Sequence, residues 1–469
     1  MRLRPLPCRQ RGPTPCRDQY AGRRPSPCPA AAHGGDRGSG HAALRSPPGR
    51  FRRTIGASSE SWRAARGRAI WWLLRTPIVD EGDHEDRRDA DRFRQEPVVS
   101  RRVAITQPYI PGYRERLWAL VIDQLAEADV DCRVFYGGDR DQEREIAARG
   151  DGIEPAWASR VGAWTLQPVR SIPKFMFRRL PRTWRGRDVL LVTEMQGTNL
   201  NAWRRAGLRQ PYVTLGHGIS ETTTQSFLAD AAEDLLNSRA MRVLTYTETG
   251  RRHVLAATRL REDQVSAFRN STDTSRLQRA MEAVTPADEV AFRDRHGIPR
   301  DARVSFFLGA LNRFKSVDLL VDAARIAFAE DPSQWLVVAG DGESRELVEA
   351  LADETGRVVL LGQSTAETYA PAAAMSRLLL NPGRVGLVAV DALVMGLPIL
   401  TTAGAAHAPE HEYLRPGIDV VDVPATPEDY ARAWIGHGGR VDAPPADRPT
   451  IEAAAQVISA TILDALGRR

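Results

Sequence analysis

The chain has 469 residues, of which 42% are hydrophobic and 26% are charged, which is ordinary for a soluble protein of two or three domains. Its formal net charge is +6, but residues 1–75 alone hold 16 arginines and 3 acidic residues. The basic excess therefore lies in a tail, which argues against nucleic-acid binding by the folded body. No apolar run approaches the roughly 18 residues that a membrane-spanning helix needs.

Cysteine use points to a reducing compartment. Cys8, Cys16 and Cys28 lie in the tail, and only Cys132 lies in the body. Neither a disulfide framework nor a zinc-ligand spacing emerges from these positions. We therefore expect a cytoplasmic protein.

Residues 1–100 are rich in Arg, Pro, Gly and Ser and show no sustained periodicity. Such a composition does not offset its ordering entropy, so we predict a disordered extension. A start site assigned too far upstream in GC-rich DNA gives the same pattern, and the use of only two lysines, Lys174 and Lys315, fits that origin. A functional basic arm is the third interpretation.

From Arg102 onward, apolar runs of strand length alternate with segments of helix length. A helix is predicted at 113–128, after a Pro/Gly loop. The strands predicted in this first series are 103–106, 132–136, 189–193, 212–215 and 242–246.

The alternation restarts after Asn270. The strands predicted in the second series are 304–308, 335–339, 358–361, 378–380 and 399–402. Such alternation is typical of parallel, doubly wound sheets. We predict an α/β fold with two Rossmann-like domains, 101–275 and 276–445, facing a central cleft. The segment 446–469 is predicted to form a helix that packs back toward the N-terminal domain.

Residues 381–402 give the strongest indication of the chemistry of this protein. A loop containing Gly386 and Leu387 leads into an apolar helix pattern that carries one carboxylate, Asp391. Free N–H groups at a helix N-terminus, together with the helix dipole, hold phosphate. A carboxylate one turn further along can accept ribose hydroxyls, so this stretch predicts nucleotide binding.

Residues 309–315 follow a predicted strand and carry two cations, Arg313 and Lys315. Placed at a strand end, this pair could neutralise a diphosphate. The alternative is a solvated pair of loop charges. The choice of lysine, in a chain whose other cations are arginines with the single exception of Lys174, favours the first interpretation.

Two glycine motifs also end predicted strands. Gly340 and Gly342 form half of a dinucleotide fingerprint whose third glycine is missing, so a tight turn lining the cleft is favoured over NAD binding. His217 lies between two glycines, where its ring could bond a sugar hydroxyl or support charge at a reacting centre. A turn or capping histidine is the alternative.

Two further features have open interpretations. His407 and His411 suggest a metal site, but the intervening Pro409 argues against a helix that carries both on one face. Residues 168–187 interleave seven cations with aromatic residues. This patch suits an anionic membrane surface or a phosphorylated acceptor, and a solvated loop is equally compatible.

With these motifs in order, residues 102–468 resemble a retaining glycosyltransferase of the GT-B fold, in the family 4 group. The segments that carry the resemblance are 270–273, 309–315, 340–342, 382–398 and 409–417.

The chain departs from this family's pattern at three places. The family usually has two glutamates eight positions apart. In this chain the corresponding positions hold Gly383 and Asp391 instead. By resemblance Asp391 holds ribose, whereas Gly383 cannot contact the sugar. Ala310 replaces an arginine, so Arg313 would supply that charge. The N-terminal glycine-rich loop is replaced around Gly112.

The resemblance implies a hexosyltransferase-type enzyme that moves a sugar from a UDP- or GDP-sugar to a glycan, glycolipid or small-molecule acceptor, with retention of configuration. Polysaccharide or glycolipid assembly in bacteria, with peripheral membrane contact through 168–187, is the expected setting. We expect no metal, no other cofactor and no nucleic-acid partner. An inactive nucleotide-sugar-binding relative and a GT-B nucleotide-sugar epimerase are the alternatives.

The predicted site residues fall into three groups. Those assigned to catalysis are His217, Arg313 and Lys315. Those assigned to the donor are Gly309, Gly340, Gly342, Gly383, Val385, Gly386, Leu387 and Asp391. Those assigned to the acceptor side are Gly112, Tyr113 and Arg114.

Overall fold

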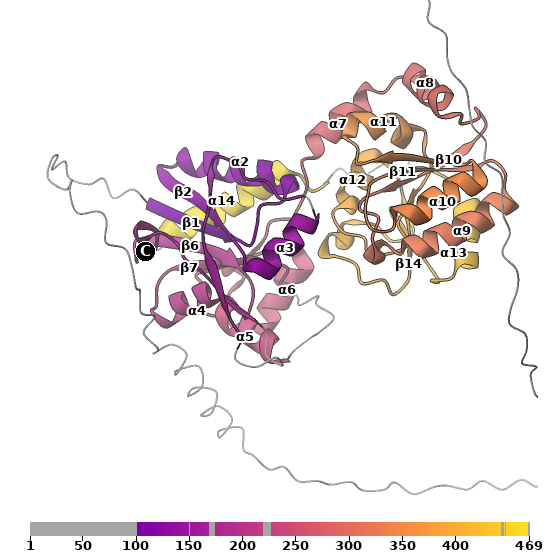
Figure 1. The fold of residues 1–469 in the computed structure, drawn as a ribbon. Helices are drawn as coiled ribbons and strands as arrows, with labels where there is room; N and C mark the ends of the chain where they lie inside the picture. Colours follow the sequence, from indigo (N-terminus) through magenta and orange to yellow (C-terminus); the bar gives the residue numbers. More distant parts are fainter. Residues whose placement is uncertain are drawn as a thin grey trace, which may run out of the picture. The chain divides into compact units, whose positions relative to one another are not determined.

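The computed structural model describes residues 101–149, 151–167, 174–218, 227–441, 445 and 447–467. The extension predicted at 1–100 lies outside these residues. The described part contains two sheets in which every strand pairing is parallel, as predicted (Figure 1).

The first sheet has seven strands in the order β3-β2-β1-β6-β7-β8-β9. These are β1 (Arg101–Gln107), β2 (Val130–Tyr136), β3 (Ala158–Arg160), β6 (Val189–Glu194), β7 (Tyr212–Gly216), β8 (Arg242–Thr245) and β9 (Val265–Ala267). A separate antiparallel hairpin joins β4 (Ala163–Leu166) to β5 (Phe175–Arg178). The first six strands have the order of a doubly wound nucleotide-binding sheet, which reverses between β1 and β6.

Helices cover both faces of this sheet because its strands are apolar on both sides. One face packs against α2 (Glu115–Ala126) and α14 (Ile451–Gly467), whose Leu117, Val121 and Ile458 are fully or almost fully buried. The other face packs against α4 (Leu200–Gly207), α5 (Phe227–Asn237) and α6 (Glu248–Ala257). The remaining helix of this domain is α3 (Arg140–Arg149). The C-terminal helix thus completes the core of the first sheet.

The second sheet has six strands in the order β12-β11-β10-β13-β14-β15. They are β10 (Arg303–Leu308), β11 (Gln334–Ala339), β12 (Val358–Gly362), β13 (Leu379–Leu380), β14 (Ile399–Thr402) and β15 (Val420–Val423). The same doubly wound order occurs here, and it reverses between β10 and β13.

Two groups of helices cover the second sheet. One face packs against α7 (Thr274–Ala283), α8 (Pro286–His296), α11 (Ala366–Met375) and α12 (Val388–Met395). The other face packs against α9 (Val317–Glu330), α10 (Arg345–Thr355) and α13 (Pro427–Gly436). Because α7 contacts α11 and α12, the chain passes from one sheet to the other between β9 and α7.

Glycines allow backbone contact among the three loops that follow β10, β11 and β13, at the carboxyl ends of these strands. A Cβ added to Gly340 would lie 1.9 Å from the carbonyl oxygen of Gly309, and one added to Gly342 would lie 2.4 Å from that of Leu311. Both glycines also have positive φ, 156° and 152°. Their lack of a side chain therefore serves contact between loops.

Gly383 is a third position of this kind. A Cβ there would lie 2.3 Å from the carbonyl oxygen of Phe314 and 2.7 Å from Cα of Lys315. These neighbours are backbone atoms, which cannot swing aside. The position at which the resemblance places a glutamate thus has no room for any side chain.

We predict that Gly383→Ala destabilises the protein by about 1–3 kcal/mol, the usual cost of overpacking a tight contact. The matched control is Gly436→Ala at the end of α13, where an added Cβ meets nothing within 4 Å. The control should be neutral or stabilising by about 0.5–1 kcal/mol. Urea unfolding followed by circular dichroism measures both, and equal stability of the two variants would contradict the close approach.

Candidate functional site

The candidate site lies where the order of the second sheet reverses, beside the carboxyl ends of β10 and β13. Two segments flank this point: residues 309–316, here the Lys315 turn, and residues 381–387, here the Gly386 loop. The Lys315 turn contains the 3₁₀ helix η4 (Arg313–Lys315), and the Gly386 loop leads into α12. Ligands of doubly wound sheets bind at such reversal points.

The Lys315 turn and the Gly386 loop are joined directly. The N–H of Arg384 donates to the carbonyl of Phe314 at 2.7 Å, and Nζ of Lys315 donates to the carbonyl of Arg384 at 2.8 Å. The Lys315 side chain also runs past the end of β10, since Cε would lie 3.6 Å from a Cβ on Gly309. The ammonium group is therefore fixed between the two segments.

Burial shifts the proton equilibria of the two charged groups here. Burial, together with the nearby Arg384, lowers the pKa of Lys315 to about 8, against the opposing effect of Asp391. Burial raises the pKa of Asp391 to about 6, opposed by a hydrogen bond from the hydroxyl of Thr272 at 3.2 Å and by Lys315. Each group is therefore more easily neutralised than the same side chain in water. An anion bound beside Lys315 would favour its protonated, charged form.

The Gly386 loop offers backbone donors. Within the described part of the chain, the N–H groups of Gly386 and Leu387 have no hydrogen-bond acceptor. They precede the first turn of α12, where the helix dipole favours negative charge. N–H groups without an acceptor at this helix N-terminus are what the sequence predicts, and phosphate binding by them stays a prediction.

Val385 is predicted to bind the donor, and the structure shows both of its backbone polar groups engaged within the protein. Its side chain is completely buried, its N–H donates to Nδ1 of His407 at 3.1 Å, and its carbonyl accepts from the N–H of Ala408 at 2.7 Å. Both backbone groups are thus in use, and Val385 supports the loop from behind. Sequence reasoning missed this contact because the two segments are distant in the chain.

Arg313 is exposed, and its guanidinium lies 4.8 Å from the ring centroid of Phe314. Its backbone N–H donates to the carboxylate of Glu343 at 3.2 Å. The cation that acts on Lys315 is instead Arg384, which sequence reasoning did not single out. Its position next to Gly383 in the loop is the only signal that the sequence gives.

The predicted residues of the first sheet meet around Tyr246. His217 follows β7, and its ring lies 4.5 Å from that of Tyr246 in an edge-to-face arrangement. Arg114, which is buried, donates from Nη2 to the hydroxyl of Tyr246 at 2.6 Å. Gly112 and Tyr113 belong to the same short 3₁₀ helix as Arg114, and Tyr113 is 41% exposed. Tyr246, which joins these residues, was not predicted as a site residue.

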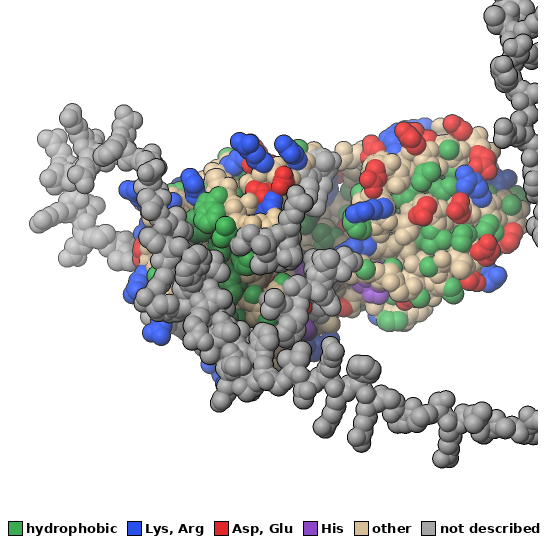
Figure 2. Space-filling model, turned by 60° about the horizontal axis from the view of Figure 1, so that its bottom comes forward, with side chains coloured by type: hydrophobic (Ala, Val, Ile, Leu, Met, Phe, Trp, Pro, Cys, Tyr) green, Lys and Arg blue, Asp and Glu red, His purple; other side chains and the backbone are tan. Residues whose placement is uncertain are grey.

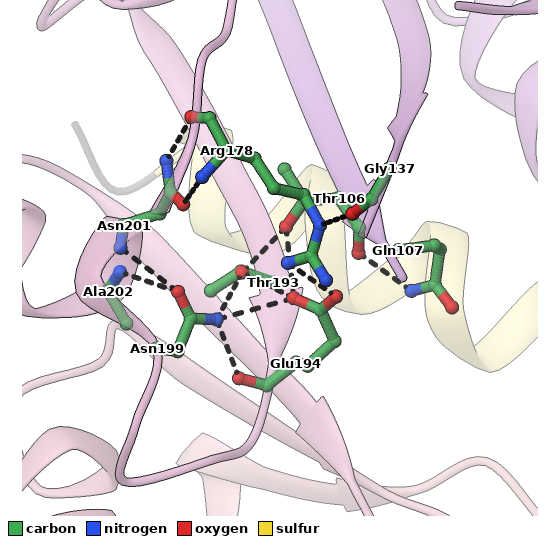
Figure 3. Close-up of polar contacts among 9 residues, drawn as sticks. All are labelled: Thr106, Gln107, Gly137, Arg178, Thr193, Glu194, Asn199, Asn201 and Ala202. Carbon is green, nitrogen blue, oxygen red and sulfur yellow. Dashed lines mark hydrogen bonds and ion pairs between the residues drawn. The ribbon is translucent and has the colours of Figure 1, made fainter. Parts of the chain in front are cut away.

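Side chains fill the reversal point of the first sheet, as Figure 3 shows. Nη1 of Arg178 forms an ion pair with Oε1 of Glu194 at 2.9 Å, and both groups are largely buried. The other carboxylate oxygen accepts from Thr106, Thr193 and Asn199. Every charge in this network has a partner, which is the condition for keeping charges in an interior.

His407 and His411 lie together although Pro409 separates them, because the 3₁₀ helix η5 (Pro409–Tyr413) places their rings face to face, 4.1 Å apart and 3° from parallel. With Asp422 they form a group whose potential ligand atoms lie within 4.8 Å of one another. Ring nitrogens bind metals in the plane of the ring, and two parallel stacked rings cannot both direct a lone pair at one ion. Nδ1 of His407 is also already an acceptor. The residues do not fit a metal in this arrangement.

The basic segment 168–187 is not one exposed patch. Residues 168–173 lie outside the described residues, and Met176, Arg178 and Trp184 are at most 9% exposed. Met176 and Arg178 belong to the β4–β5 hairpin, and Arg178 also belongs to the network of Figure 3. Trp184 packs edge-to-face against Phe135 in the core. On the face drawn in Figure 2, acidic and basic side chains are interspersed over the C-terminal domain. Among the helices of the described residues, none is long and apolar enough to span a bilayer.

Comparisons with known proteins bear on the second sheet above all. Residues 302–436 match the family model described as "Glycosyl transferases group 1". A D-inositol 3-phosphate glycosyltransferase of Geodermatophilus obscurus is 33% identical over 170 residues, which cover 33% of this chain and 37% of that protein. The match thus spans little more than a third of that relative.

Solved structures of low identity resemble the fold. Anabaena Alr3699/HepE, solved in complex with UDP, is 16% identical with a TM-score of 0.49, over 78% of this chain and 96% of that one. The UDP-GlcNAc 2-epimerase of Methanocaldococcus jannaschii is 10% identical with a TM-score of 0.46, over 76% of this chain and 99% of that one.

The family match begins just before β10 and ends with α13, so it takes in both the Lys315 turn and the Gly386 loop. The narrower family 4 group and its retaining stereochemistry stay predictions. Residues 302–436 thus match the glycosyl transferases group 1 family, and the described chain has the two doubly wound sheets that the GT-B resemblance predicts.

Proposed function

We propose that this protein transfers a sugar from a nucleoside diphosphate donor, UDP or GDP, to an acceptor with retention of anomeric configuration. The observation that carries the proposal is the arrangement at the reversal point of the second sheet. There a fixed, half-buried lysine, two backbone N–H groups without an acceptor among the described residues, and a carboxylate in the first turn of α12 lie together.

The chemistry follows from where charge develops. When the bond between sugar and diphosphate breaks, negative charge grows on the departing phosphate oxygens. Lys315 and the N–H groups of Gly386 and Leu387 are held in place before the reaction, so they stabilise this charge without reorganising. Asp391 would hold the ribose hydroxyls, which places the diphosphate toward the N-terminus of α12. No proton transfer to the departing diphosphate is needed at neutral pH.

The acceptor would bind on the side of the first sheet, near His217, Tyr246 and Tyr113. A glycan, a glycolipid or a small molecule fits the proposal, and the name of the Geodermatophilus relative supports the small-molecule class. His217 would contact the reacting sugar. A cytoplasmic location and a peripheral contact with a membrane belong to the same proposal.

Lys315→Ala should reduce kcat by about 100- to 1,000-fold, the effect of removing one preorganised donor at a developing oxyanion. The fold should stay intact, because the side chain forms one hydrogen bond to a loop carbonyl. The control is Arg325→Ala, which removes an exposed cation of α9 paired with Asp322 and Glu354. Transfer from UDP- and GDP-sugars, measured by product chromatography, decides between the variants.

Near-normal turnover of Lys315→Ala would contradict the assignment. Two other results on the wild-type protein would each support a different function. Tight UDP or GDP binding in calorimetry without turnover of any donor would indicate an inactive relative. Conversion of a donor sugar without acceptor would indicate an epimerase. The anomeric configuration of the product, read by NMR, tests retention.

We predict a bell-shaped pH profile of kcat/KM for the donor. Lys315 acts as a cation, so kcat/KM should fall as pH rises through about 8, where the free enzyme loses that proton. Asp391 acts as a carboxylate, so kcat/KM should fall as pH decreases through about 6. Lys315→Arg should move the basic limb out of range because arginine stays protonated. A basic limb that stays near pH 8 in that variant would exclude Lys315 as its source.

A further inference from the structure

His407 and the residue after it bind the backbone of the Gly386 loop at Val385. The N–H of Val385 donates to Nδ1 of His407 at 3.1 Å, and the next residue, Ala408, donates its N–H to the carbonyl of Val385 at 2.7 Å. Residues 407–408 thus hold the peptide groups on both sides of Val385. The next residue in the loop is Gly386, whose N–H is free among the described residues.

The hydrogen bond fixes the tautomer of the ring. Since Nδ1 accepts, the single proton of the neutral imidazole lies on Nε2. Nε2 is buried, with no acceptor among the described residues. The ring is held flat against that of His411, and flipping it would present a C–H group to the N–H of Val385.

The surroundings keep this ring neutral. Burial is the main cause that lowers the pKa of His407 to about 4, and His411, Arg384 and Lys315 lower it further against the opposing effect of Asp422. These four groups come from η5, β15, the Gly386 loop and the Lys315 turn, which are the elements that face the ring. At neutral pH the acceptor nitrogen is therefore available.

We propose that His407 is a positioning residue for the donor: its neutral Nε2–H tautomer holds the N–H of Val385 and thereby aims the free N–H groups of Gly386 and Leu387 at the diphosphate. This role rests on the proposed function. His407 itself contacts neither substrate nor the reacting atoms.

A matched pair of substitutions isolates the acceptor. His407→Asn keeps an acceptor oxygen near the position of Nδ1, whereas His407→Leu has nearly the same shape without one. The leucine variant should raise the Kd of UDP and the KM of the donor about tenfold, the equivalent of one lost hydrogen bond. The asparagine variant should stay within about threefold of wild type, which is the rescue that simple space filling would not give. Equal effects of the two variants, or a lower melting temperature with unchanged Kd and KM, would overturn the proposal.

A measurement on the wild-type protein separates this proposal from the proposed function. With ¹⁵N-labelled histidine, NMR at pH 7 should show His407 as the Nε2–H tautomer, and the spectrum needs no nucleotide. The Nδ1–H tautomer would overturn the positioning role even if UDP binds. Absence of UDP and GDP binding by a protein with the expected tautomer would instead overturn the proposed function, and the positioning role with it.

Discussion

The candidate site depends on one close contact, the backbone-to-backbone packing of the Lys315 turn against the Gly386 loop at Gly383. The missing Cβ of Gly383 lets the two backbones approach, so that the N–H of Arg384 and the ammonium group of Lys315 both bond across the junction. This contact removes part of the Lys315 side chain from water, which lowers the pKa of its ammonium group. It also sets the direction in which the chain enters α12, and hence where its free N–H groups point. A side chain at position 383 would separate the parts that the proposed reaction needs together.

The two sheets have the same doubly wound strand order, but different groups lie at their reversal points. Both reverse their strand order in the doubly wound way, and in each the reversal opens a place beyond the carboxyl ends of the strands. In the first sheet, the Arg178–Glu194 pair and its threonine and asparagine partners fill that place. At the reversal point of the second sheet, backbone donors and one half-buried ammonium group remain. The backbone donors of the second sheet suit a phosphate-bearing ligand, whereas the donors and acceptors at the first reversal point bind one another.

Much of the fold could be predicted from the sequence, because long apolar strands separated by helix-length segments leave few alternatives. The observed β1, β6, β10 and β11 lie within two residues of their predicted bounds. The short strands β3, β9 and β15 were missed because three or four partly exposed residues carry no clear period. Strand β5 of the hairpin was missed because it lies inside the segment 168–187, which composition marks as basic, and β4 directly precedes that segment.

Site residues could be predicted where they stand close together in the sequence, but not where a contact joins distant segments. Lys315, Gly386 and Asp391 stand out through spacing within one segment, and the structure brings all three to one reversal point. Gly340 and Gly342 are expected to line the ligand, and the structure adds that their lack of a side chain allows contact between loops. The link from His407 to Val385, the closeness of Arg384 to Lys315, and the meeting of Arg114 with Tyr246 join segments far apart in the chain. A single sequence shows no such pairing.

Hydrogen–deuterium exchange of the full chain with and without UDP, resolved by mass spectrometry, tests the central claim most directly. If the Lys315 turn and the Gly386 loop together hold the diphosphate, UDP should slow exchange in peptides covering 309–316 and 381–391. Exchange around the filled reversal point at 193–201 should not change. Protection confined to the first sheet, or binding of UDP without protection in 381–391, would contradict the account.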